Sequence, residues 1–327
     1  MPARQMLVKE KIQEFRFPWE GREFAVGISI GMVAIDSNDN LSTLLSNADS
    51  ACYAAKEMGR NRVHIYEHGD KELVQRKNQM AWASRIQESL DKNRFRLYYQ
   101  CIAISEDHER ANGHFEILLR MVDEDGELVP PGAFIPAAER YSLMSNIDRW
   151  VVDNVFKWLD EHQDKARQVN KCAINLSGDS LGDERFFDFV KNKFSQYKVK
   201  PEQICFEITE TVAITNLNKA ISFISDFRTI GCSFALDDFG TGLSSFGYLK
   251  NLQVDYLKID GAFIKRIDEN KIDYAMVESI NNIGHVIGLK TIAEYVENQD
   301  SLDLLKNIGI DYVQGYFVHK PEPISNF

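Results

Sequence analysis

Apolar and polar positions divide the chain into two regions with different spacing. In residues 1–66, alternating apolar positions predict a strand or hairpin arm at 24–35, helical spacing predicts a helix at 44–59, and a further strand is predicted at 61–66. Residues 67–93 are polar and carry apolar positions four apart, which is typical of one helix face. Because this segment has no Gly/Ser-rich or Pro-rich stretch, we expect a stiff helical connector between two domains.

From residue 94 to residue 327, predicted strands alternate with predicted helices. Short apolar runs predict strands at 95–101, 114–121, 170–176, 203–209, 232–237, 255–260, 289–294 and 311–314. Helical spacing predicts helices at 148–163, 183–197, 217–230 and 271–287. This rhythm matches a (β/α)8 TIM-like barrel, and an open doubly wound sheet is the alternative. The polar link at 102–113 suits a hairpin better than a crossover helix, so we expect one antiparallel strand.

Composition narrows the class of protein. Of the 327 residues, 44% are hydrophobic and 27% are charged, which is ordinary for a soluble globular protein. No apolar run approaches the roughly 20 residues that cross a bilayer, and the charged N-terminus lacks the apolar core of a signal peptide. We therefore expect a cytoplasmic chain without a membrane segment, although a longer parent protein could be tethered to a membrane.

Net charge and cysteine content exclude two further classes. The formal net charge of -11 argues against binding of a nucleic-acid polymer, which requires basic surface. The five cysteines are scattered and form no CxxC pair, so we expect reduced, mostly buried thiols and no disulfide framework or zinc site. An acidic protein can still bind an anionic ligand where metal ions lie between its carboxylates and the phosphates.

Polar side chains occupy the last part of six predicted strands. They are Asn175, Glu207, Asp237 with Asp238, Lys258, Glu294 and Gln314. In a parallel barrel these strand ends meet at one mouth, where converging charges repel unless something offsets them. Hard cations such as Mg²⁺ or Mn²⁺ take carboxylate and amide oxygens as ligands. Two adjacent aspartates could hold a pair of ions about 3.5–4 Å apart, an arrangement suited to displacing a phosphate oxygen by water.

A second polar pair lies on the strand at 114–121. Glu116 and Arg120 are four apart, with Leu118 between them, and therefore share a face of the strand. A carboxylate for a metal and a guanidinium for a phosphate would both point inward. The alternative interpretation is a buried salt bridge between barrel strands.

Several motifs in the second region of the sequence are similar to those of a known family. The run at 116–120 (EILLR) resembles the signature of the EAL domains, which hydrolyse the cyclic dinucleotide cyclic di-GMP to linear pGpG. The other matching runs, in family order, are INLS at 174–177, FEITE at 206–210, ALDDFGTGLSSFGYL at 235–249, VDYLKIDGAFI at 254–264, TIAEYVE at 291–297 and QGYFVHKPEP at 314–323. The resemblance covers residues 94–327.

The resemblance implies a role for each matching residue. One metal would be held by Glu116, Asn175, Glu207 and Asp237, and a second by Asp237, Asp238 and Glu294. Lys258 and Gln314 would position or activate the attacking water, and Glu210 would hold the mobile loop after Asp237. The substrate side would comprise Gln100, Glu116, Leu118, Arg120, Asp237 and Pro321. The family also implies two Mg²⁺ or Mn²⁺ ions and a homodimer formed through elements that include residues 239–251.

The sequence departs from the family pattern at four positions. Ile117 replaces alanine, and Cys101 and Gln253 each replace a common proline. Tyr295 occupies a position that is usually glycine, directly after Glu294. We expect a bulky residue there to shift the loop and weaken the second metal, so that Tyr295→Gly would raise activity at limiting metal.

Residues 1–66 resemble the C-terminal half of a GGDEF domain, through SIGMVA at 29–34 and the run at 48–63. The GGDEF signature is absent from the chain, so we expect no cyclase activity from it. The leading hypothesis is therefore an active phosphodiesterase. A receptor that binds cyclic di-GMP without cutting it is the alternative, and an interaction scaffold with a vestigial site is a third hypothesis.

Overall fold

The structure, a computed structural model, describes residues 16–19, 22–25, 28–35, 61–66, 82–110, 113–240 and 246–327, and isolated residues between 40 and 55. The chain forms two compact units, Met1–Arg85 and Ile86–Phe327, which are considered separately. Part of the predicted connector, 67–81, lies outside the described residues, and the following residues 82–91 are helical as predicted. Among the described residues, no helix combines the length and apolar character that crossing a bilayer requires.

The first unit contains two short sheets. Strands β1 (Arg16–Trp19) and β2 (Arg22–Ala25) pair antiparallel, and β3 (Ile30–Val33) pairs parallel with β4 (Val63–Tyr66). The strand predicted at 61–66 is thus confirmed. The strand or hairpin arm predicted at 24–35 is found as two separate strands, because β2 pairs back on β1 as a hairpin arm while β3 belongs to the other sheet.

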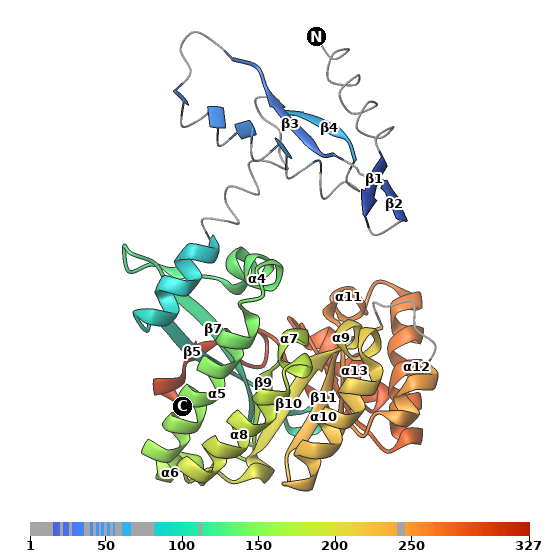
Figure 1. The fold of residues 1–327 in the computed structure, drawn as a ribbon. Coiled ribbons are helices and arrows are strands. Elements are labelled where there is room, and N and C mark those ends of the chain that lie inside the picture. Colours follow the sequence, from blue (N-terminus) through green and yellow to red (C-terminus); the bar gives the residue numbers. More distant parts are fainter. Residues whose placement is uncertain are drawn as a thin grey trace. The chain divides into compact units, whose positions relative to one another are not determined.

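The second unit is built on one curled sheet surrounded by helices (Figure 1). Its strands are β5 (Phe95–Cys101), β6 (Ala103–Ile104), β7 (His114–Val122), β8 (Leu128–Val129), β9 (Lys171–Asn175), β10 (Ile204–Thr209), β11 (Ser233–Phe239), β12 (Tyr256–Ile259), β13 (Lys290–Ala293), β14 (Tyr312–Val313) and β15 (Glu322–Pro323). From β7 through β9 to β14 each neighbouring pair is parallel. Strand β5 pairs antiparallel with β7, which confirms the predicted hairpin.

The sheet closes on itself because β6 follows β5 directly in the chain and pairs with β14. The predicted (β/α)8 barrel with one antiparallel strand is therefore confirmed, and the open-sheet alternative is wrong. Closure brings the carboxyl ends of the parallel strands to one mouth of the barrel. The five cysteines are free, as predicted, and Cys172, Cys205 and Cys232 are buried.

The helices of the second unit follow the capping chemistry of the sequence. They are α4 (Pro131–Arg140), α5 (Met144–Glu161), α6 (Gln163–Ala166), α7 (Gly178–Gly182), α8 (Glu184–Gln196), α9 (Glu210–Thr215), α10 (Leu217–Thr229), α11 (Gly261–Ile264), α12 (Lys271–Ile287) and α13 (Gln299–Ile308). In α12 the Asn270 side chain accepts from the Ile272 N–H, and Gly288 ends the helix at φ 92°. Helix α4 has no predicted counterpart, because Pro131 and Pro136 make its sequence resemble a loop.

Candidate functional site

Lys258 lies at the centre of the polar group in the barrel mouth. Lys258 is on strand β12 and is completely buried, with 0% of its surface exposed. Its ammonium nitrogen is 2.8 Å from Glu207, 2.9 Å from Glu294, 3.2 Å from Asp237 and 3.3 Å from Glu116. These carboxylates come from four other strands or strand ends, so the sheet itself brings them together. Four carboxylates around one ammonium leave three excess negative charges if all are ionised.

Glu116 connects three of the residues that the sequence singled out. Its carboxylate accepts hydrogen bonds from the Asn175 amide at 2.6 Å, from the Gln314 amide at 2.7 Å and from Lys258. Asn175 is the last residue of β9, and Gln314 directly follows β14. The side-chain amide of Gln314 also donates to Gln100 on β5 at 3.2 Å. Residues from opposite sides of the barrel thus form one network.

Charge and burial act in opposite directions on these groups. Burial by itself lowers the pKa of Lys258, but the surrounding carboxylates outweigh it and raise this pKa well above its usual value. Burial raises the pKa of Glu116, yet Lys258 and the two amide donors outweigh it and lower the pKa. Burial dominates for Glu207, whose pKa is raised well above its usual value. The network is short of positive charge.

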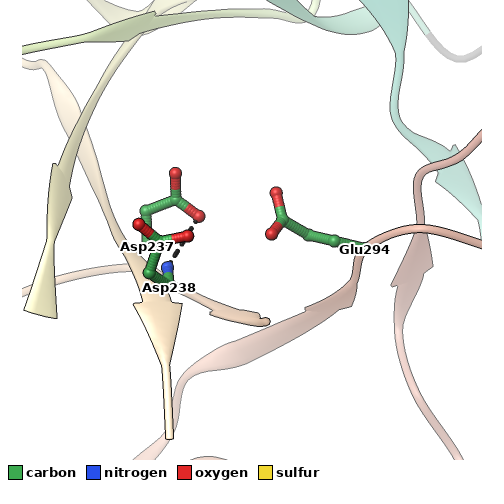
Figure 2. A group of neighbouring side chains, drawn as sticks. All are labelled: Asp237, Asp238 and Glu294. Carbon is green, nitrogen blue, oxygen red and sulfur yellow. Dashed lines mark hydrogen bonds between the residues drawn. The ribbon is translucent and has the colours of Figure 1, made fainter. Parts of the chain in front are cut away.

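A second cluster lies beside the first at the carboxyl ends of β11 and β13. Figure 2 shows the Glu294 side chain extending from the loop directly after β13 toward Asp237 and Asp238. One carboxylate oxygen from each residue lies within 4.8 Å of the others. Asp238 adopts the left-handed conformation at φ 53°, which is unusual for a residue other than glycine. Burial and the charges of Asp237 and Asp260 raise the pKa of Asp238 to about 6.

The donor set of both clusters fits divalent cations. All donors are carboxylate or amide oxygens, which Mg²⁺ and Mn²⁺ prefer. One oxygen of Glu207 is buried and has no hydrogen-bond partner among the described residues. A buried carboxylate oxygen without a partner is costly unless a cation binds it. The geometry therefore provides acceptors for more positive charge than Lys258 supplies.

A cavity of about 460 Å³ opens beside these clusters. Its lining residues include Gln100, Glu116, Leu118, Arg120, Asp238, Glu294, Gln314 and Pro321, which are all among the predicted site residues. The Arg120 guanidinium lies over the Tyr98 ring at 5.3 Å and donates to the Leu119 carbonyl. Arg120 thus remains at the wall of the cavity, and no salt bridge between it and Glu116 is present among the described residues.

Glu210 is separate from both clusters. It is buried at the start of α9, and its two carboxylate oxygens accept from the Gly240 N–H at 2.9 Å and from the Tyr248 hydroxyl at 2.7 Å. These contacts hold both ends of the segment that follows Asp238, of which residues 241–245 lie outside the described residues. Glu210 therefore contacts residues on both sides of 241–245, and the loop-holding role implied by the family resemblance stays a prediction.

Some contributors to the site carry no local sequence signal. Asp148 on α5 is buried and accepts at 2.6–2.9 Å from the Ser177 N–H, the Ser177 hydroxyl and the Ser180 hydroxyl. It thereby fixes the loop that follows Asn175. Pro131 at the start of α4 lines the cavity. Neither residue stands at a strand end, so strand-end reasoning could not find them.

Comparison with known proteins gives a family and a set of relatives. The profile of the EAL domain family matches residues 83–321, and that of the diguanylate cyclase GGDEF domain matches residues 3–62. The chain is 42% identical over 307 residues to the cyclic di-GMP phosphodiesterase PdeB of Shewanella oneidensis, covering 93% of the chain and 35% of PdeB. It is 34% identical over 314 residues to the cyclic di-GMP phosphodiesterase PdeF of Escherichia coli, covering 96% of the chain and 41% of PdeF.

Solved structures give the same picture for the barrel. The structure of the PaMucR phosphodiesterase in complex with c-di-GMP has a TM-score of 0.69 and 28% identity, covering 75% of this chain and 99% of that one. The FimX EAL domain of Pseudomonas aeruginosa, bound to c-di-GMP, has a TM-score of 0.68 and 30% identity, covering 74% and 96%. The chain spans less than half of the length of the two curated relatives, at 35% and 41%.

Proposed function

Because the chain belongs to the EAL domain family, we propose that it hydrolyses cyclic di-GMP to linear pGpG. The observation that carries the proposal is the pair of carboxylate clusters that meet at Asp237, beside a cavity with Arg120 in its wall. A phosphodiester is an anion, and this site is acidic, so a cation must lie between the two. The catalytic domain would be residues 94–327, preceded by a GGDEF-like fragment at 1–66 and a connector at 67–93.

We assign the ions to the two clusters and propose that they are Mg²⁺ or Mn²⁺. Glu116, Asn175, Glu207 and Asp237 would hold one ion, and Asp237, Asp238 and Glu294 the other. Bound there, divalent cations lower the pKa of water and neutralise phosphate charge. The unpaired Glu207 oxygen and the shortage of positive charge around Lys258 support this assignment.

The protein's own side chains have separable roles in this proposal. Lys258 and Gln314 position or activate the attacking water by hydrogen bonding. Arg120 pairs with a phosphate oxygen, and Gln100, Leu118 and Pro321 form the guanine side of the cavity. The water gives up a proton as its oxygen forms a bond to phosphorus and the P–O3′ bond breaks, and the departing 3′ oxygen takes up a proton. Glu210 acts through the segment that it holds.

A direct assay tests the proposal. The protein is incubated with cyclic di-GMP and either Mg²⁺ or Mn²⁺, and pGpG is measured by liquid chromatography. We expect pGpG from the wild type and none from Glu116→Ala, which loses a metal ligand, whereas Glu161→Ala at an exposed end of α5 serves as the matched control. Circular dichroism checks that both variants fold. Bound but uncut cyclic di-GMP would favour the receptor, and neither binding nor cleavage would favour the scaffold.

We also propose that the domain forms a homodimer through α12 and the neighbouring segment 239–251. Helix α12 exposes Ile272 (73%), Met276 (38%) and Val286 (89%), apolar side chains that a second copy of the domain would cover. Val286 also lines an apolar groove with Ile283 and residues of the segment before β12. Val286→Asp should shift the mass measured by light scattering from dimer to monomer. A wild type that is monomeric at all concentrations would refute this part of the proposal.

A further inference from the structure

Tyr295 directly follows Glu294, and its ring packs against the backbone of Gly261. A Cβ atom added to Gly261 would overlap Cδ2 of Tyr295 and come within 2.9 Å of its Cβ, so the ring fills the space that a side chain at 261 would need. The ammonium of Lys265 lies 4.2 Å from the centre of the same ring. The side chain is nevertheless 51% exposed and forms part of the cavity wall. Tyr295 therefore connects the loop after β13 to the start of α11.

The backbone of Tyr295 is held in a conformation that the residue does not prefer. Its φ is 55°, in the left-handed region that costs a non-glycine residue about 1 kcal/mol or more. On either side of it, the Glu294 N–H donates to the Ile259 carbonyl at 3.3 Å and the Val296 N–H donates to the Gln314 carbonyl at 3.0 Å. The contact between the ring and Gly261 adds a third restraint. Strained conformations of this kind persist where the surroundings determine them.

The position of the ring bears on Glu294. The carboxylate of Glu294 lies with those of Asp237 and Asp238 in one group of donors within 4.8 Å. From the sequence we expected the bulk of Tyr295 to shift the loop and so weaken the binding of the second metal. In the structure Glu294 nevertheless remains in the group with Asp237 and Asp238. Because consecutive side chains share a backbone, fixing Tyr295 against Gly261 also fixes the direction in which Glu294 leaves the chain.

We propose that Tyr295 is a positioning residue for the second divalent cation, and that its packing on Gly261 holds Glu294 toward Asp237 and Asp238. This inference rests on the two-ion site of the proposed function. A glycine at 295 would adopt the left-handed conformation without strain but would also visit many others. The loop would then hold Glu294 less firmly. Metal binding would have to order the loop, and the conformational entropy lost in doing so would weaken the affinity for the ion.

The proposal is tested by measuring Mn²⁺ binding in the absence of substrate. The protein is titrated with Mn²⁺, and electron paramagnetic resonance measures the free ion. Tyr295→Gly removes the contact from one side and Gly261→Ala from the other. We expect each to weaken the binding of one of two ions about ten-fold, in the range of residues that orient metal ligands. The double variant should bind Mn²⁺ no more weakly than the single variant with the lower Mn²⁺ affinity, because both changes break the same contact. Tyr295→Phe, which keeps the ring, should retain the wild-type affinity for Mn²⁺.

The control is Tyr316→Ala, because Tyr316 is a similarly exposed tyrosine of the same cavity wall, whose ring is not the one that packs on Gly261. It should leave Mn²⁺ affinity unchanged. Hydrolysis of cyclic di-GMP by Tyr295→Gly should require more Mn²⁺ for half-maximal rate and recover at high Mn²⁺. Unchanged or tighter Mn²⁺ binding by Tyr295→Gly would overturn the proposal, even if Gly261→Ala failed to fold. Two-ion binding without hydrolysis in the wild type would refute the proposed function alone.

Discussion

Replacing Lys258 with methionine is the sharpest test of the charge balance at the site. The side chain is completely buried, and its ammonium lies 2.8–3.3 Å from four carboxylates. At an effective dielectric constant of about 20, one ion pair at about 3 Å has a gross attraction of about 5 kcal/mol. Most of this attraction offsets the desolvation of the charges. Methionine has a similar length and no charge, so the carboxylates would lose their counter-ion without a large change in volume.

The expected loss of stability follows from what remains behind. Removing one partner of a buried ion pair costs about 3–5 kcal/mol, since the other charge stays buried. For a domain of this size, 1 kcal/mol changes the melting temperature by about 2–4 °C, so we expect the metal-free variant to melt about 10 °C lower. Added Mg²⁺ should restore part of this loss and raise the melting temperature of Lys258→Met more than that of the wild type.

Differential scanning fluorimetry in a chelator and then in Mg²⁺ measures both effects. Lys92→Met is the control, because Lys92 forms an exposed ion pair with Glu88, and such pairs contribute about 0–1 kcal/mol. A metal-free Lys258→Met protein that melts within about 2 °C of the wild type would refute the view that the ammonium offsets the carboxylate charge. Equal stabilisation of both proteins by Mg²⁺ would refute the expectation that the metal replaces the positive charge lost with Lys258.

Three further predictions concern residues around the site. Glu210→Ala should lower the rate of hydrolysis about 10–100-fold with the fold intact by circular dichroism, and Tyr248→Phe should lower it less, because one of two contacts to the segment remains. Arg120→Lys should raise KM for cyclic di-GMP about ten-fold with little change in kcat, since lysine keeps the charge but loses the fork that binds phosphate; an unchanged KM would count against a phosphate contact. Burial raises the pKa of Asp148 from 3.8 to about 6, so the folded state binds more protons than the unfolded state and this carboxyl contributes less stability as pH rises between these values. Urea unfolding should therefore show wild type losing about 3 kcal/mol relative to Asp148→Asn between about pH 4 and about pH 7, and parallel pH curves would contradict this.

Much of the barrel could be predicted because its strands and helices are encoded locally. The predicted helix at 271–287 coincides with α12, where an asparagine cap and a terminal glycine define the ends. Strand β5 coincides with the predicted 95–101, because its buried positions alternate. Helix α4 could not be predicted, since two prolines outweigh its apolar spacing until packing against the sheet is known.

The sequence by itself determined which residues stand at the strand ends, because alternation along a strand and the motif order are local properties. Asp237, Lys258 and Glu294 are therefore recognisable as strand-end residues from the order of amino acids alone. Only the tertiary structure decided how those ends meet, for Lys258 reaches Glu116 across 142 residues of sequence. The packing of the Tyr295 ring on Gly261 is likewise a contact between segments that are separate in the sequence. Contacts between distant residues depend on the register and closure of the whole sheet, and no local pattern specifies them.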